Sequence, residues 1–236
     1  MKKTRLNAFR KTRAEGFTLT ELLVVVVTVG ILGFLLLPAL AGTKSNSQAF
    51  QCLQNERQLV RAWRMYAEDN GDVLVPSLQG GSARGGNFDP TIGGPGWAEG
   101  WLDWTTLSDN TNTAFLNTDH YARLAAYLAH SASVFKCPAD NFLSALQQAR
   151  GWSQRSRSYS GNLGIGQGNA ESGPWSAIYK HCTKLKEIPS PANTWVFIEE
   201  HPDSINDPGF FNPQTATSMT DTPSTLHNDA CSLSFA

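Results

Sequence analysis

The feature that most constrains this chain is a long apolar run near its N-terminus. Residues 22–40 contain no Asp, Glu, Lys or Arg. As a helix, at 1.5 Å per residue, the run would be about 28 Å long, close to the thickness of a bilayer's hydrocarbon core. Basic residues crowd its N-terminal side, whereas only Lys44 follows closely. This bias predicts a single-pass segment with residues 1–15 in the cytoplasm.

Charge separates the N-terminus from the remainder of the chain. The 236 residues carry 19 Lys and Arg against 20 Asp and Glu, a formal net charge of −1. Residues 1–16 hold six of the basic residues and one of the acidic ones, which leaves 13 basic and 19 acidic residues beyond them. Because a mildly acidic domain repels phosphate backbones, we expect no nucleic acid among its partners.

A short motif marks the junction between the basic segment and the apolar run. It reads Gly16-Phe17-Thr18-Leu19-Thr20-Glu21-Leu22-Leu23. This motif resembles the processing signal of type IV pilins and type II secretion pseudopilins. The resemblance implies cleavage after Gly16 by a prepilin peptidase, loss of residues 1–16 as a leader, and N-methylation of Phe17. It also implies other pilin or pseudopilin subunits, an inner-membrane assembly platform and membrane lipid as partners, with the head in the periplasm or on the bacterial surface.

Glu21 and Pro38 fall where processed pilins carry a glutamate and a proline. A carboxylate at the edge of an apolar span costs roughly 2.5 kcal/mol or more unless it lies at the interface or has a cationic partner. In a filament, the amine of a neighbouring subunit's Phe17 is such a partner, so the resemblance implies an assembly role for Glu21. The alternative is a carboxylate that rests among lipid headgroups. Pro38 lacks an N–H and is expected to kink or loosen the helix.

A secretory signal peptide is the competing interpretation of the same N-terminus. Ala39-Leu40-Ala41 offers a small-x-small cleavage site, and cleavage there would release a secreted protein such as an enzyme. The apolar run is longer than the roughly 7 to 15 residues typical of a signal peptide. We therefore favour the prepilin signal, with residues 17–41 as the transmembrane and filament-core helix and residues 42–236 as the head.

The helix is expected to continue into the head as far as about residue 70, where Asn70-Gly71 is a stop signal. Strands are predicted at residues 156–160, 194–198 and 231–235. We therefore predict an α+β, pilin-like fold in which a long N-terminal helix packs on a small antiparallel sheet with long loops. The amphipathic half of that helix carries an apolar stripe at spacings of three and four. Its members are Ala49, Cys52, Leu53, Leu59, Val60, Trp63, Tyr66 and Ala67.

Several blocks of the head narrow the resemblance to the prepilin-type proteins abundant in Verrucomicrobia and Planctomycetes. They are residues 52–59, 65–71, 134–140, 157–160 and 194–201. The stretch that begins at His227 also resembles that group's closing pattern, in which a His and nine further residues lead into Asp-Gly. Here the sequence stops before that Asp, so a truncated C-terminus is one expectation.

Four cysteines follow the apolar run: Cys52, Cys137, Cys182 and Cys231. An even number in an exported domain favours disulfides, although four cysteines allow three pairings and the sequence does not choose among them. Our hypothesis pairs Cys52 with Cys137 and Cys182 with Cys231. No two of them have CxxC spacing, which argues against zinc or redox chemistry.

An acidic loop after residues 194–198 is the candidate ligand site. Ca²⁺ binds several oxygen ligands on adaptable backbone, and the resemblance to major pseudopilins implies a calcium site in a C-terminal loop. The alternative is a solvated turn whose side chains cap their own backbone. The candidate ligands are Glu199, Glu200, Asp203, Asn206 and Asp207.

Catalytic motifs and a group of tryptophans are the remaining sequence features that indicate function. The chain has no HExxH and no Gly-x-Ser-x-Gly, so we do not expect an enzyme. Trp97, Trp101 and Trp104 lie in a glycine-rich stretch, where tryptophans either pin a loop to the core or bind a glycan. The leading hypothesis is therefore a structural filament subunit, and the alternative is a monomeric, membrane-anchored binding protein for a glycan or protein ligand.

Overall fold

The computed structural model of the protein describes residues 16–87, 94–168, 181–212 and 217–236. Within the first helix it leaves out the side chains of Gly33 and of residues 35–45. The predicted leader therefore lies outside the described residues except for Gly16. The chain divides into two compact units, Met1–Lys44 and Ser45–Ala236.

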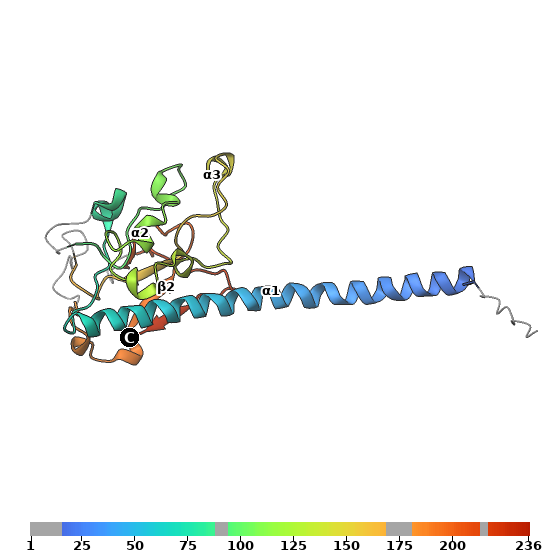
Figure 1. Ribbon diagram of the computed structural model, residues 1–236, viewed down its shortest axis with the longest axis horizontal. Coiled ribbons are helices and arrows are strands. Elements are labelled where there is room, and N and C mark those ends of the chain that lie inside the picture. Colours follow the sequence, from blue (N-terminus) through green and yellow to red (C-terminus); the bar gives the residue numbers. More distant parts are fainter. Residues whose placement is uncertain (1–15, 88–93, 169–180, 213–216) are drawn as a thin grey trace, which may run out of the picture. The chain divides into compact units, whose positions relative to one another are not determined.

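The first helix, α1 (Leu19–Asp69), is continuous and ends where the sequence predicts (Figure 1). In the first unit its described apolar side chains are exposed; Val26, for example, is 63% exposed. The predicted membrane span, residues 22–40, extends into the part of α1 whose side chains are not described. Among the residues that were described, none of the helices combines the length and the apolar character needed to cross a membrane.

In the second unit, α1 buries most of the predicted stripe. Leu53 is an exception, because its side chain is 43% exposed. The helix then ends in a left-handed turn: Gly71 has a φ of +65°, and the Asp72 N–H donates to the Ala67 carbonyl at 2.8 Å, as in a Schellman motif. The stripe residues in the core are Cys52, Leu59, Trp63, Tyr66 and Ala67.

In the described part of the chain, four short strands form one sheet in the order β3-β1-β2-β4. They are β1 (Tyr159–Asn162), β2 (Trp195–Glu199), β3 (Gly209–Phe210) and β4 (Leu233–Phe235). The pairs β1–β2 and β2–β4 are antiparallel, whereas β1–β3 is parallel. The prediction of a wholly antiparallel sheet is therefore wrong. The chain reverses direction after β2. Since β1 and β4 occupy the two sides of β2 in the sheet, β3 pairs with the far side of β1 and runs parallel to it.

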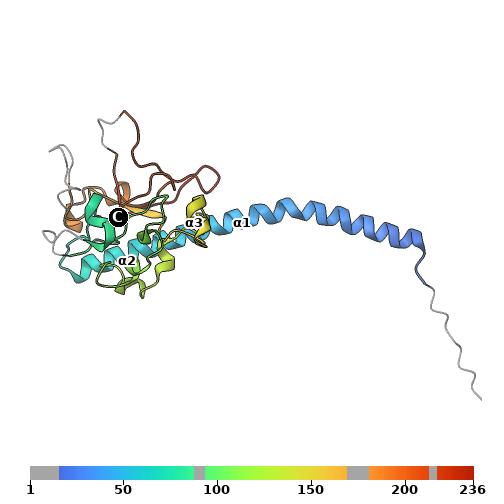
Figure 2. The same ribbon diagram turned by 90° about the horizontal axis from the view of Figure 1, so that it is seen from above.

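The remaining elements of the second unit are brief, and irregular chain connects them (Figure 2). Within the described residues, two further α-helices are present, α2 (Ala114–Asn117) and α3 (Ala145–Ala149). The 3₁₀ segments are η1 (Gly80–Gly86), which is kinked at Arg84 and Gly85, η3 (Ser108–Asn110), η4 (Ala126–Leu128), η5 (Ala132–Phe135), η6 (Leu185–Glu187) and η7 (Pro191–Asn193). The fold class is thus α+β, with the long loops that the sequence predicts.

Trp97 anchors the loop between η1 and α2 to the core. Its ring is fully buried, stacks on Phe135 at 5.7 Å between centroids and meets Phe197 of β2 edge-on at 4.8 Å. Its Nε1–H donates to the Pro208 carbonyl at 3.1 Å. For Trp97, the interpretation of a pinned loop is therefore confirmed.

Candidate functional site

The N-terminus of α1 is closed by a pair of reciprocal hydrogen bonds. The Thr18 N–H and hydroxyl both donate to Glu21 Oε2, at 2.8 and 2.7 Å, and the Glu21 N–H lies 3.3 Å from Thr18 Oγ1. This is a capping box, which satisfies backbone donors that the first helical turn leaves unpaired. The Thr-x-x-Glu pattern in the sequence carried that signal. Glu21 thus has a local structural role in addition to the assembly role implied by the resemblance.

The structure gives less information about the other predicted processing and assembly residues, Gly16, Phe17 and Pro38. Gly16 precedes the helix, and Phe17 beside it is 83% exposed. Pro38 lies within α1, which continues through it, but its side chain is outside the described part of the structure. Cleavage, methylation and the role of Pro38 therefore stay predictions.

The predicted calcium ligands lie in different surroundings. Glu199 ends β2 and Glu200 follows it, so their side chains leave opposite faces of the strand. Asp203 is on the surface, with 75% of its side chain exposed. Asp207 is buried and accepts hydrogen bonds from the N–H groups of Gly80 and Gly209, both at 2.9 Å.

Consequently, the described chain does not gather these carboxylates around a common point. Among the described residues, one group of three or more His, Cys, Asp or Glu side chains has ligand atoms close enough to share an ion. Of the five candidates, that group includes only Glu199. Asn206 uses its backbone carbonyl to accept from the Arg157 guanidinium at 3.1 Å.

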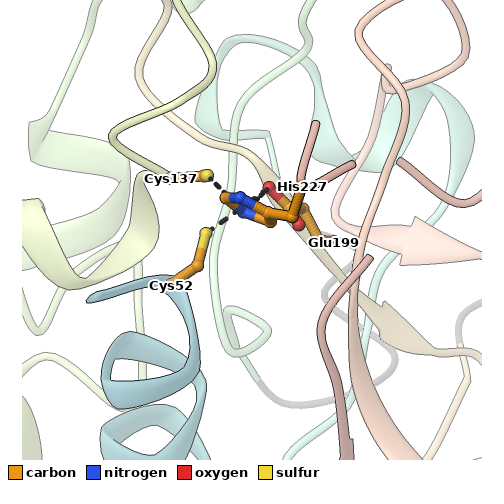
Figure 3. Close-up of side chains that lie close together, drawn as sticks. All are labelled: Cys52, Cys137, Glu199 and His227. Atoms are coloured by element: carbon orange, nitrogen blue, oxygen red, sulfur yellow. Dashed lines mark hydrogen bonds and ion pairs between the residues drawn. The ribbon is translucent and has the colours of Figure 1, made fainter. Parts of the chain in front are cut away.

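That group consists of Cys52, Cys137, Glu199 and His227, and Figure 3 shows the four side chains pointing toward one another. They come from four separate segments: α1, the loop after η5, the end of β2, and the turn that precedes β4. One ligand atom from each residue lies within 4.8 Å of the other three, and all four side chains are buried.

The contacts inside this Cys–Cys–Glu–His cluster form a chain around a central point. Cys52 Sγ lies 3.4 Å from Glu199 Oε1. The same carboxylate oxygen lies 3.4 Å from His227 Nε2, which in turn lies 3.3 Å from Cys137 Sγ. The reactive atoms of two thiols, one imidazole and one carboxylate therefore share a single buried space.

Surrounding donors are directed at the sulfur and carboxylate atoms. The Tyr159 hydroxyl of β1 donates to Cys52 Sγ at 2.9 Å, and the Ala139 N–H donates to Cys137 Sγ at 3.4 Å. The Ser232 N–H donates to Glu199 Oε2 at 3.4 Å. Among the described residues, His227 Nδ1 has no hydrogen-bond partner.

The electrostatic surroundings of the cluster are negative. The hydrogen bond with Cys137, burial and the nearby Glu199 carboxylate all raise the pKa of the Cys52 thiol. Glu56, one helical turn beyond Cys52, is also buried, and burial raises the pKa of its carboxyl group to about 8. Burial, Glu199 and Glu56 together raise the pKa of Cys231. Negative charge in this pocket is therefore costly unless a cation is present.

The structure contains neither of the two expected disulfides, because all four cysteines are free. The hypothesis of a Cys52–Cys137 disulfide is wrong, although the two thiols do lie close together. Cys182 Sγ instead donates to the Glu187 carbonyl at 3.4 Å. The argument from CxxC spacing did not anticipate the cluster, because that argument detects only ligands close together in sequence.

Comparison with known proteins gives one partial similarity. The type II secretion system core protein G of Aeromonas hydrophila is 39% identical over 61 residues, which are 26% of this chain and 43% of that protein. The chain thus spans less than half the length of the relative it matches. No family model and no solved structure matches the chain. The similarity supports a pseudopilin-like relationship.

Proposed function

We propose that the protein is a structural subunit of a type II secretion or type IV pilus-like filament, with a pilin-like fold. The observation that carries the proposal is the similarity to core protein G of a type II secretion system. The prepilin-like motif at Gly16–Glu21 supports it, because it lies at the start of the long helix α1. In this role the protein performs no catalysis.

The first unit offers the surface that such a filament requires. Leu22, Val24, Val26 and Val29 are each more than half exposed in the single chain. Contiguous apolar surface of this kind is rare on an isolated soluble protein and marks a contact with another protein or with lipid. Bundling with the same helix of other subunits would bury it.

The capping box suggests how Glu21 takes part in assembly. Both hydrogen bonds from Thr18 use Oε2 of the exposed Glu21 carboxylate. The other oxygen of the Glu21 carboxylate, Oε1, is then left to bind a cation from another molecule. Prepilin peptidase would cut after Gly16, and the N-methylated amine of a neighbouring subunit's Phe17 would be that cation. Before assembly, the subunit would be held at the bacterial inner membrane, near the assembly platform.

Two substitutions at Glu21 test this mechanism. Glu21→Gln retains an acceptor for the capping box, which accommodates Glu or Gln at this position, but removes the charge. Glu21→Ala removes both. We expect both variants to be cleaved after Gly16 and both to enter filaments poorly. Normal incorporation of Glu21→Gln, with loss in Glu21→Ala, would show that Glu21 acts through the helix cap and not through its charge.

The mature N-terminus tests the proposed processing. Mass spectrometry of the protein purified from its host is expected to find N-methyl-Phe17 as the first residue. A chain that begins at Gly42 would instead support release by signal peptidase and would exclude the filament role.

One structural observation supports the alternative function, a surface binding protein. Trp101 and Trp104 line an open surface pocket together with Arg155 and Asp203, and the Arg155 guanidinium lies 4.2 Å from the centroid of the Trp104 ring. Trp97, the third tryptophan of that stretch, is buried and takes no part. Specific binding on a glycan array by protein that does not enter filaments would favour this alternative.

A further inference from the structure

We propose that Cys52, Cys137, Glu199 and His227 bind one Zn²⁺ ion in a closed, structural site. The site is independent of the filament role, since all four residues lie in the second unit, Ser45–Ala236. It shares only Glu199 with the calcium site that the sequence suggested, and it would hold a different metal.

The donor set is the first argument. Zn²⁺ is bound in proteins by Cys sulfur, His nitrogen and carboxylate oxygen, and structural sites usually have four such ligands in a tetrahedron. The cluster supplies two sulfurs, one imidazole nitrogen and one carboxylate oxygen. Four protein ligands leave no position open for water or substrate, which is typical of a structural site and not of a catalytic one.

The distances fit the same geometry. With Zn–S near 2.3 Å and Zn–N and Zn–O near 2.1 Å, a tetrahedron places its nitrogen and oxygen donors about 3.4 Å apart and a sulfur about 3.6 Å from either. The structure has 3.4 Å between His227 Nε2 and Glu199 Oε1. The two sulfur contacts are 3.3 Å from Cys137 to His227 and 3.4 Å from Cys52 to Glu199. Small side-chain movements would therefore complete the coordination.

Charge balance is the second argument. Glu199 is fully buried, and its ion-pair partner in the described part of the chain is His227. The Glu56 carboxyl group is buried as well, and burial disfavours its ionised form. Burying carboxylates without a compensating cation is costly. A divalent ion at the centre of the cluster would supply the missing positive charge.

The surrounding hydrogen bonds also suit a metal-bound state. Tyr159 and the Ala139 N–H donate to the two sulfur atoms, and the Ser232 N–H donates to the carboxylate oxygen that faces away from the centre. Donors of this kind orient ligands and stabilise their anionic forms. They come from β1, from the loop after η5 and from the segment before β4, so the ligand shell is supported from several sides.

The ion would join segments that have few regular elements to hold them. It would link α1 to the end of β2, and it would fix both the Cys137 loop and the turn at His227. Because the four ligands are far apart in the sequence, an unfolded chain does not present them together. The free energy of metal binding would then contribute to the free energy of folding.

The principal experiment measures metal content and its dependence on the ligands. The full-length protein is purified in detergent without added chelator, and zinc is quantified by elemental mass spectrometry. We expect one zinc per chain in the wild type and a large loss in Cys137→Ser and His227→Gln. Cys182→Ser is the matched control, because Cys182 is also a buried cysteine but bonds to a backbone carbonyl outside the cluster. It should retain the full metal content.

Two further measurements on the wild type remain informative if the variants fail to fold. A strong chelator should lower Tm, and added Zn²⁺ should restore it. Replacement by Co²⁺ should produce the visible absorption of tetrahedral, thiolate-bound cobalt. A Cys52–Cys137 disulfide in the purified protein, or a wild type that contains no zinc and takes up none, would overturn the proposal. Neither result would affect the test of the mature N-terminus, so the filament role stands or falls separately.

Discussion

The two halves of α1 share one backbone but are stabilised in different ways. In the first unit the described hydrogen bonds are local: the capping box closes the first turn, and the Thr28 hydroxyl donates to the carbonyls of Val24 and Val25 at 2.9 Å. In the second unit the helix bonds to distant segments. Asn55 Nδ2 donates to the Lys136 carbonyl at 2.9 Å, and Gln48 Nε2 to the Pro138 carbonyl at 3.0 Å.

The two halves of α1 therefore obtain their stability from different contacts. The C-terminal half buries its stripe inside its own chain, so its packing contributes to folding of the head. The N-terminal half exposes its apolar side chains, so any burial there must come from another molecule. Most helical stability in proteins comes from packing of an apolar face and not from propensity. The comparison therefore predicts that substitutions in the two halves affect different measurements.

The largest expected effect is at Trp63. Its side chain is almost fully buried in the core cluster, and truncation of a buried Trp to Ala costs roughly 3–5 kcal/mol. Trp63→Ala should therefore lower the free energy of unfolding of the head by about that amount, measured by urea denaturation of the detergent-solubilised chain with circular dichroism. Val26→Ala is the matched substitution in the exposed half, with an expected change within about 0.5 kcal/mol. Equal effects of the two substitutions would remove the distinction between the halves.

The second prediction compares a buried carboxylate with the exposed one at Glu21. Burial raises the pKa of Glu99 from 4.5 to about 8. Since the folded state holds this proton more tightly, the stabilisation is fully present below about pH 4.5 and is lost as the pH rises through about 8. Stability should fall by at most about 1.4 kcal/mol per pH unit for this one proton.

Glu99→Gln isolates that contribution. Glutamine keeps an acceptor for the Gly96 N–H, which lies 3.1 Å from Glu99 Oε1, but it does not titrate. Thermal unfolding between pH 5 and pH 9 should show a flatter profile for Glu99→Gln than for the wild type. Glu21→Gln should leave the profile unchanged, since Glu21 lies in the first unit, outside the head whose unfolding is measured. An unchanged slope in Glu99→Gln would contradict the prediction.

The third prediction concerns polar contacts. Asn55→Ala leaves the Lys136 carbonyl without its buried donor, which costs about 1–3 kcal/mol. Thr28→Val removes hydroxyl bonds to carbonyls of the same helix, which bond within the helix in any case, so its effect should be near zero. Equilibrium unfolding of both variants provides the measurement. A loss at Thr28 that matches the loss at Asn55 would mean that the exposed half is coupled to folding of the head.

These contrasts also explain how much of the fold the sequence could predict. The end of α1, most of its stripe and the positions of β2 and β4 follow from local patterns, because spacing, stop signals and β-branched residues act over a few positions. The order of the sheet does not. It depends on which strands meet after the chain has folded, and no local pattern distinguished a parallel β3 from an antiparallel one.

The candidate site shows the same limit. The hypothesis of a Cys52–Cys137 disulfide placed these two cysteines close together. It did not include Glu199, which had been assigned to a calcium loop. His227 had been noted only for its resemblance to a closing pattern. The four ligands lie on four segments that tertiary packing brings together, whereas sequence motifs for metals rely on short spacings. The Thr-x-x-Glu capping box, by contrast, is local and was available in the sequence.

The smallest expected effect is at that capping box. Thr18→Ala removes the hydroxyl that donates to Glu21 Oε2 and accepts from the Glu21 N–H, and loss of such a cap costs about 1 kcal/mol of local helix stability. Faster amide hydrogen exchange is expected in the first turn of α1, with no change in Tm of the head. Thr18→Ser, which keeps the hydroxyl, should exchange like the wild type. Because the cap also orients the Glu21 carboxylate, Thr18→Ala should reduce filament incorporation less than Glu21→Gln does; a larger reduction would mean that helix geometry, and not charge, sets the position of each subunit.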